Sequence, residues 1–210
     1  MDVSVIIPAY NEEKNISNVL SVIGGMNELA DILVVNDGST DNTSAIAHSC
    51  GVRVIDLEEN MGKSHAMWTG LQNTHGIAVL FLDADLVGLK QNQVLELIKP
   101  ILDGSADMTL GLFTSGRGVT DLAQRLAPFL TGQRAVRRVI LEGLPREEWI
   151  SGYGIEVALT RYVKEKGFRV QEVTLDNVTH TMKEEKLGLA RGVKARLKMY
   201  WEIAKEVNRN

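Results

Sequence analysis

The sequence has few of the features that mark disulfide-stapled, secreted or membrane-spanning chains. It contains one cysteine, Cys50, so no intramolecular disulfide can form and no zinc site can be built from several thiolates. Its longest aliphatic and aromatic run, Ile77–Leu82, is far shorter than the roughly 20 apolar residues of a transmembrane helix. The first ten residues lack the basic segment and the apolar stretch of a signal peptide. These absences predict a cytoplasmic chain.

The sequence also lacks an excess of positive charge, since its formal net charge is −4. This balance argues against a general nucleic-acid binder, which usually carries a basic face. The charge is divided unevenly: residues 181–210 contain eight Lys and Arg against four Glu, a net +4, which leaves −8 for the first 180 residues. The 210 residues, 44% of them hydrophobic, are enough for one domain and short for two.

Short apolar segments alternate with helical periodicity through the first half of the chain. We expect strands at 3–8, 32–36, 52–57 and 77–82, and helices at 11–24, 39–51, 63–74 and 91–102. This order predicts an α/β fold, a mostly parallel sheet with helices on both faces. Ligands bind such sheets at the carboxyl ends of the strands.

The second half is less regular. We expect strands at 108–113 and 168–175 and helices at 155–166 and 189–206. A glycine-rich loop at 115–120 is followed by a long helical stretch that carries four arginines: Arg125, Arg134, Arg137 and Arg138.

Polar residues follow all four strands of the first half, so the sequence places them at one edge of the sheet. Asp83 and Asp85 leave a buried strand two residues apart, and paired carboxylates suit a divalent cation, although a solvated turn or a helix cap would explain them too. Lys63 begins a helix beside Gly62 and is either a phosphate partner or a solvated lysine; the spacing excludes a P-loop, because Leu57 occupies the place of the required glycine.

Two further candidates carry a structural alternative. Asp37 is followed by Gly38 and Ser39, which is also ordinary turn chemistry, but an aspartate at a strand end can accept hydrogen bonds from a base or a ribose. His180 lies in a polar segment after a strand; a lone histidine is more often structural, yet this one could complete a metal site with Asp83 and Asp85.

Three stretches together resemble the family 2 nucleotide-sugar glycosyltransferases of the GT-A fold. They are Val5–Glu12, Val34–Asp41, with Asn36 where Asp is more usual, and Asp83–Asp85. The resemblance implies a Rossmann-like GT-A domain over residues 1–210, with a nucleotide-sugar half (1–105), an acceptor half (106–180) and a basic helical tail (181–210). It assigns the donor site to Pro8, Ala9, Tyr10, Glu12, Asp37, Lys63, Asp83, Ala84 and Asp85.

Three further stretches, two of them in the second half, are similar to the glucosyl- and mannosyl-3-phosphoglycerate synthases: Asn60–Trp68, Gly116–Thr120 and Gly152–Glu156. By this resemblance Arg117, Gly118, Val119 and Thr120 form the acceptor loop, although Gly118 is an insertion there. Glu156 faces the donor sugar, and Asp83, Asp85 and His180 hold Mg²⁺ or Mn²⁺.

The implied function is transfer of a hexose from a nucleoside diphosphate sugar, with UDP favoured, to a phosphate-bearing acceptor such as 3-phosphoglycerate. Asp85, Lys63 and Glu156 are the catalytic candidates: the first two would stabilise the departing diphosphate and the third the sugar. Dolichyl- or polyprenyl-phosphate sugar transfer at a membrane surface and an inactive nucleotide-sugar-binding module are the alternatives. A sugar nucleotidyltransferase is rejected, because Pro8–Glu13 replaces its glycine-rich loop.

The basic tail carries an apolar stripe at helical spacing, formed by Leu189, Val193, Leu197, Tyr200, Trp201 and Ala204. A helix packed on its own domain is the simpler interpretation. The alternative is an interfacial helix, on the anionic inner face of a membrane or at the subunit contact of a homodimer.

Overall fold

The computed structural model describes residues 2–114, 131–150 and 154–181. Contacts divide the chain into two units, Met1–Thr179 and His180–Asn210, of which the second is described only at His180 and Thr181. The predicted acceptor loop (Arg117, Gly118, Val119 and Thr120) and the predicted basic tail beyond Thr181 lie outside the described residues.

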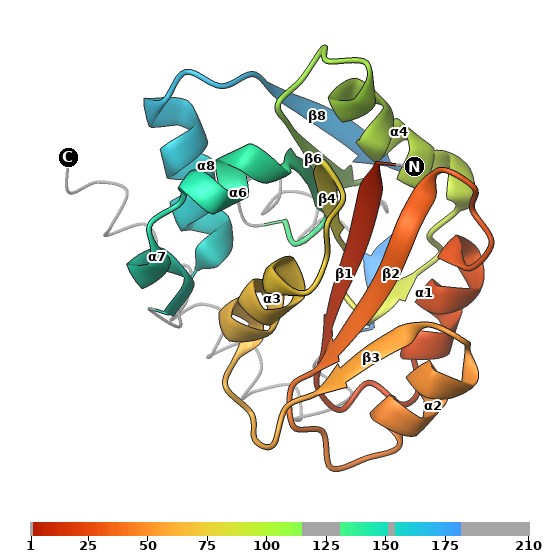
Figure 1. Cartoon of the computed structure of the whole chain (residues 1–210). Coiled ribbons are helices and arrows are strands. Elements are labelled where there is room, and N and C mark those ends of the chain that lie inside the picture. Colours follow the sequence, from red (N-terminus) through yellow and green to blue (C-terminus); the bar gives the residue numbers. More distant parts are fainter. Residues whose placement is uncertain (1, 115–130, 151–153, 182–210) are drawn as a thin grey trace, which may run out of the picture. The chain divides into compact units, whose positions relative to one another are not determined.

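A seven-stranded mixed sheet forms the centre of the first unit (Figure 1), in the order β3-β2-β1-β4-β7-β6-β8. β7 is antiparallel to both of its neighbours, and the other pairs are parallel. The strands are β1 (Val3–Ala9), β2 (Leu29–Asn36), β3 (Arg53–Asp56), β4 (Ala78–Phe81), β6 (Met108–Phe113), β7 (Arg134–Arg137) and β8 (Val170–Leu175). A two-stranded sheet joins β5 (Leu86–Val87) to β9 (Thr179–His180), and the boundary between the two units falls within β9.

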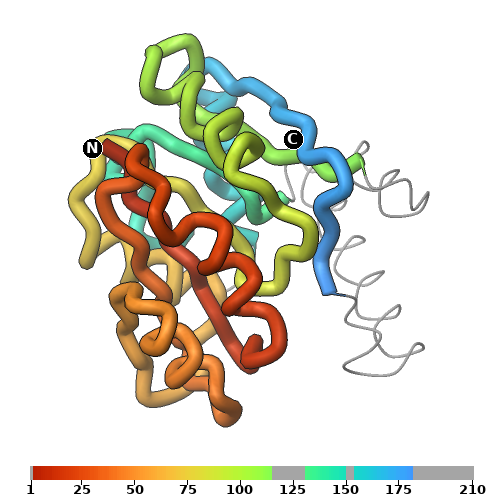
Figure 2. Tube along the Cα trace, turned by 90° about the vertical axis from the view of Figure 1, so that its right-hand side faces the viewer, coloured from red at the N-terminus to blue at the C-terminus, as the bar shows by residue number. Residues whose placement is uncertain are grey.

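Helices cover both faces of the sheet, as the alternating sequence predicts. Apolar side chains of α1 (Ile16–Ile23), α2 (Thr43–Ser49) and α4 (Gln91–Leu102) share one core with the alternate residues of β1 that point to the same face of the sheet. Figure 2 shows α1 beside α4. The opposite core is built on α3 (Lys63–Gln72), α6 (Arg138–Gly143), α7 (Arg146–Ile150) and α8 (Ile155–Glu165). Strand β1 is buried on both faces, because Ile6 belongs to the second core while Val5 and Ile7 belong to the first.

Two expectations about local structure are wrong. The helix expected from Asn11 begins at Ile16, because Asn11 adopts a left-handed φ of 53° and bonds the next loop instead. Residues 134–137, expected within a long helix, form the strand β7 instead, and α6 begins at Arg138. In contrast, Gln91–Leu102 and Met108–Phe113 have the bounds that their periodicity predicts.

Among the described residues, no helix has the length and apolar character needed to cross a bilayer. This finding agrees with the short apolar runs of the sequence.

Asp107, a buried residue just before β6, is hydrogen-bonded to residues at the ends of the neighbouring strands β7 and β8. Asp107 accepts hydrogen bonds from Arg169 Nε at 3.0 Å, from the Arg169 main-chain N–H at 2.9 Å and from Arg137 Nη1 at 3.2 Å. Its side chain is only 8% exposed, and hydrogen bonds from Arg169 outweigh burial and hold the pKa of Asp107 well below its usual range. The charged form of Asp107 therefore stabilises the folded state.

We expect Asp107→Asn to lower the free energy of unfolding at pH 7 by about 1–3 kcal/mol, the usual cost of losing charge-assisted hydrogen bonds. Because the folded-state pKa is lowered, the stabilisation is present above the unfolded pKa near 4 and is lost as pH falls below it. Urea titrations at several pH values should show that the difference in free energy of unfolding between wild type and Asp107→Asn decreases as the pH is lowered below about 5. A gap between the proteins that does not change with pH would contradict this role; Glu28→Gln, at an exposed carboxylate, is the control.

Candidate active site

The loops that follow β1 and β2 are bonded to each other at the carboxyl edge of the sheet. The main-chain N–H of Asn11 donates to Ser39 Oγ at 2.9 Å, and Asn11 Oδ1 accepts from the Thr40 N–H at 2.9 Å. The Glu12 N–H donates to Thr43 Oγ1 at 2.7 Å. Asparagine tolerates the left-handed conformation that this exchange requires better than most residues do. The two loops therefore form one preformed rim.

Four of the residues predicted to bind the nucleotide-sugar donor lie on this rim. Pro8 and Ala9 end β1, opposite Val35 and Asn36 of β2, and Ala9 is buried. Tyr10 follows and is 46% exposed. Glu12 accepts a hydrogen bond from Asn15 Nδ2 at 2.8 Å.

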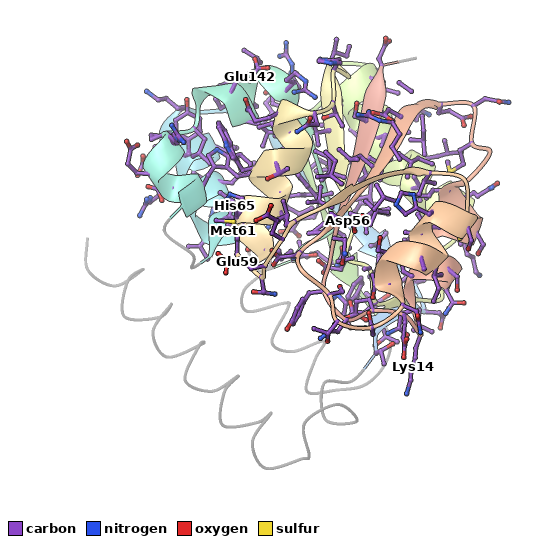
Figure 3. The ribbon with its side chains drawn as sticks, turned by 60° about the horizontal axis from the view of Figure 1, so that its bottom comes forward. Lys14, Asp56, Glu59, Met61, His65 and Glu142 are labelled. Carbon is purple, nitrogen blue, oxygen red and sulfur yellow. The ribbon has the colours of Figure 1, made fainter. Side chains whose placement is uncertain are left out.

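Asp37 connects this rim to the start of α3. Its side chain is buried, and its two carboxylate oxygens accept the main-chain N–H groups of Met61 and Gly62 at 2.8 and 2.9 Å. Figure 3 shows Glu59, Met61 and His65 close together where the chain enters α3. Asp37 thus holds the turn that precedes Lys63. This is a structural role of Asp37, in addition to the nucleoside contact predicted for it.

Lys63 lies between two carboxylates that come from distant parts of the sequence. Its Nζ is 2.6 Å from Asp83 Oδ1 and 2.8 Å from Glu156 Oε1. The two carboxylate side chains are 17% and 15% exposed, and that of Lys63 is 39% exposed. α3, the β4 end and α8 each supply one member, so the structure brings together three of the predicted site residues.

The surroundings keep Lys63 and Glu156 ionised. Burial lowers the pKa of Lys63, but the charges of Asp83 and then Glu156 outweigh it and raise that pKa above its usual value. Burial also raises the pKa of Glu156, but Lys63 and Arg134 outweigh it, so the Glu156 carboxyl group has a lowered pKa. Lys63 therefore keeps its proton at neutral pH and Glu156 does not.

Arg134 is a buried cation next to this group that the sequence did not single out. Its side chain is completely buried; Nη1 donates to the Glu156 carbonyl at 3.1 Å and Nε to the Thr131 carbonyl at 3.2 Å. Burial lowers the pKa of Arg134 to about 10, despite the charges of Glu156 and Asp83. It is still protonated at neutral pH.

Gln133 is a second site residue that the sequence does not indicate, because the pattern around it predicts a helix. Its Nε2 donates to Asp83 Oδ2 at 2.8 Å, and its Oε1 accepts from the Asp83 main-chain N–H at 3.1 Å. The signal available in the sequence was Gly132, a residue that breaks helices.

Asp83, Asp85 and His180 are, within the described part of the chain, the group that could hold a metal ion. One ligand atom of each lies within 4.8 Å of the other two. Ala84, between the aspartates, is 4% exposed and packs into the core, which fixes the backbone that carries both carboxylates. Two carboxylate oxygens and an imidazole nitrogen suit Mg²⁺ or Mn²⁺, so the donor set fits the predicted cation.

Comparison with known proteins supports the resemblance seen in the sequence. Residues 4–153 match the family model described as glycosyl transferase family 2. A glucosyl-3-phosphoglycerate synthase of Mycobacterium tuberculosis is 31% identical over 195 residues, which cover 75% of this chain and 59% of that protein. A 4,4'-diaponeurosporenoate glycosyltransferase of Staphylococcus aureus is 39% identical over 100 residues, 45% of this chain and 27% of that protein. The chain thus spans less than two thirds of the curated relatives that it matches.

Solved structures confirm the GT-A fold. The M. tuberculosis glucosyl-3-phosphoglycerate synthase in complex with Mn²⁺, UDP and phosphoglyceric acid has a TM-score of 0.73 and 27% identity, covering 89% of this chain and 73% of that one. Its complex with Mn²⁺, UDP-glucose and phosphoglyceric acid has a TM-score of 0.72 and 26% identity, covering 94% and 78%.

Proposed function

Because residues 4–153 match its family model, the chain belongs to glycosyl transferase family 2, and we propose that it transfers a hexose from UDP-hexose to a phosphate-bearing acceptor. The observation that carries this proposal is the group formed by Lys63, Asp83 and Glu156, in which a charged lysine lies beside the aspartate pair and a carboxylate faces it. The relatives whose structures contain UDP-glucose and phosphoglyceric acid support the choice of donor and acceptor class.

In this proposal each part of the site has one task. The rim residues Pro8, Ala9, Tyr10 and Glu12 bind the nucleoside, together with Asp37. Asp83, Asp85 and His180 would hold Mg²⁺ or Mn²⁺, which supplies positive charge beside the diphosphate when it is bound. A relative's structure that contains Mg²⁺ and UDP supports this pairing.

Lys63 and Glu156 act on the two sides of the breaking bond. Lys63, protonated at Nζ, would stabilise the negative charge that develops on the departing diphosphate. Glu156, ionised, would stabilise the positive character that develops on the sugar ring. Both groups are held before substrate arrives, so little reorganisation is needed during transfer.

A donor-by-acceptor screen tests the proposal. Purified protein with Mn²⁺ is incubated with UDP- and GDP-hexoses, and release of the nucleoside diphosphate is measured with 3-phosphoglycerate, with a short polyprenyl phosphate and without acceptor. We expect release with a UDP-hexose that depends on 3-phosphoglycerate or a related small phosphate, and NMR of the product gives its anomeric form. Release only with polyprenyl phosphate would favour the membrane alternative, and donor binding without release an inactive module.

The acceptor loop predicted from the sequence gives a sharper test. We expect Arg117→Ala to raise the KM for the phosphate-bearing acceptor about 10- to 100-fold, since a charge-assisted hydrogen bond is worth about 1.5–3 kcal/mol. The KM for the donor should change little. An unchanged acceptor KM would rule out phosphate binding by Arg117, and Arg53→Ala, at an arginine that pairs with Asp31 on the outer strands, is the matched control.

A transfer reaction of this kind agrees with a cytoplasmic location. We also propose that membrane contact, if the acceptor proves to be a lipid phosphate, is made by the basic tail. Salt-sensitive binding to anionic liposomes measures that contact directly.

A further inference from the structure

Gln133 recognises Asp83 through both ends of its carboxamide. The amide nitrogen donates to the carboxylate, and the amide oxygen accepts from the main-chain N–H of the same aspartate. Gln133 itself is completely buried and directly precedes β7, whose first residue, Arg134, pairs with β4 on one side and with β6 on the other. The Gln133 carbonyl also accepts a hydrogen bond from the Gly111 N–H of β6 at 2.8 Å. The backbone that carries the carboxamide is therefore held against the edge of the sheet by its own bond to β6 and by the strand that follows it.

Lys63 and Gln133 divide the Asp83 carboxylate between them. Oδ1 is 2.6 Å from Lys63 Nζ, and Oδ2 is 2.8 Å from Gln133 Nε2. Two donors on different oxygens fix the rotation of the carboxylate about its χ2 axis, which is otherwise a broad torsion. A carboxylate offers about four acceptor sites, so an oxygen can hold a hydrogen bond and a cation at the same time.

The backbone before Gln133 is shaped to allow this contact. A Cβ atom at Gly132 would lie 2.5 Å from Asp83 Oδ2 and 2.7 Å from Lys63 Nζ, closer than real Cβ contacts. Glycine at this position lets the chain pass directly over the Lys63–Asp83 pair and present the next side chain to it. The adjacent Thr131 is tied down as well, since its Oγ1 donates to the Gly111 carbonyl at 2.7 Å.

We propose that Gln133 is a positioning residue that orients the Asp83 carboxylate for the divalent cation, an inference that rests on the function proposed above. Partners that orient metal-ligating side chains from outside the ligand set typically contribute about 10- to 100-fold to metal affinity. Gln133 acts through Asp83 and touches neither cation nor substrate.

Titration calorimetry with Mn²⁺ in the presence of UDP tests the inference without requiring turnover. Gln133→Met keeps the length of the side chain and removes both hydrogen bonds; we expect the Kd for Mn²⁺ to rise about 10- to 100-fold. Gln133→Leu also removes both hydrogen bonds, with a different apolar shape and no added charge, and should weaken Mn²⁺ binding to a similar extent. This second variant also serves if the methionine variant does not fold.

Thr74→Val is the matched control. Thr74 is buried at the far end of α3, where its hydroxyl donates to the Gly70 carbonyl at 2.9 Å and accepts from Arg138 Nη2 at 2.9 Å. The isosteric substitution thus also removes two buried hydrogen bonds. It should lower the Tm as Gln133→Met does and leave the Kd for Mn²⁺ unchanged.

The outcomes separate the two proposals. Wild-type protein that binds Mn²⁺ and UDP, with a folded Gln133→Met variant of equal affinity, would overturn the positioning role alone. Wild-type protein that binds no Mn²⁺ in the presence of UDP would overturn the metal-dependent function and the inference with it. A Kd that rises in both Gln133 variants and not in Thr74→Val confirms the inference.

Discussion

Lys63→Met is expected to reduce turnover of the nucleotide sugar about 10²- to 10³-fold, the usual loss when a group that stabilises developing negative charge is removed. Methionine keeps most of the aliphatic stem, so the change is confined to the charge. Two effects add. The diphosphate loses a preorganised cation. In addition, Asp83 and Glu156, which Lys63 bridges in the wild type at 2.6 and 2.8 Å, lose the positive charge between them. Their mutual repulsion raises the pKa of Glu156 toward the protonated form.

Single-turnover rates and the KM for the donor, measured with saturating Mn²⁺, provide the readout. We expect most of the loss in the rate, because the charge is needed as the bond breaks. Lys14→Met, at the exposed lysine labelled in Figure 3, is the control and should retain wild-type turnover. Lys63→Arg retains charge but not geometry and should recover only part of the activity. Wild-type turnover in Lys63→Met would show that the lysine only stabilises the fold.

The nucleotide-sugar half of the fold was predictable because its signals are local. β1, β2 and β4 are short apolar segments bounded by polar turns, and the helices α1 and α4 between and after them bury apolar residues at the 3.6-residue period. The order of alternation then specifies a parallel sheet and the edge at which its loops gather. Gln91–Leu102 shows this most clearly, since the helix has the predicted bounds.

β7 could not be predicted in the same way. Arg134–Arg137 has four residues, of which two are arginines, and Arg134 is completely buried, which no hydropathy pattern anticipates. The segment is a strand because β4 and β6 offer it backbone partners on both sides, and those contacts are long-range. Local sequence carried the opposite signal, because arginine and alanine are good helix formers.

The residues of the candidate site also differ in how far local sequence predicts them. Resemblance to a family identified Lys63, Asp83 and Glu156 one by one, whereas their contact depends on how α3, β4 and α8 pack. Gln133 and Arg134 belong to no motif and lie immediately before and at the start of β7, where the sequence pattern indicates a helix, so sequence alone points to neither of them. The site contributes little to the net charge of −8 in the first 180 residues, because Asp83 and Glu156 are balanced by Lys63 and Arg134 and only Asp85 adds a negative charge that a cation would offset.

Asp85→Ala is expected to abolish metal-dependent turnover while leaving the fold intact. Asp85 is half-buried and belongs to the group with Asp83 and His180, whereas its neighbour Ala84 makes the core contacts of this turn. Removal of one carboxylate from three protein ligands lowers both the charge of the site and its ability to hold Mg²⁺ or Mn²⁺. We expect a loss of at least about 10²-fold in turnover at any Mn²⁺ concentration that supports the wild type.

Thermal unfolding shows whether that loss comes from ligand binding. At about 100 times its Kd, a ligand that binds only the folded state stabilises it by about 2.7 kcal/mol. For a chain of this size that corresponds to a rise in Tm of about 5–10 °C. Wild-type protein should show such a rise with Mn²⁺ and UDP together, and Asp85→Ala should show little of it although its Tm without ligands is unchanged. Asp103→Ala, at an exposed carboxylate that follows α4, should respond like the wild type. An equal rise in Asp85→Ala, accompanied by normal turnover, would show that Asp85 does not hold the cation and would shift the search to other ligands around Asp83.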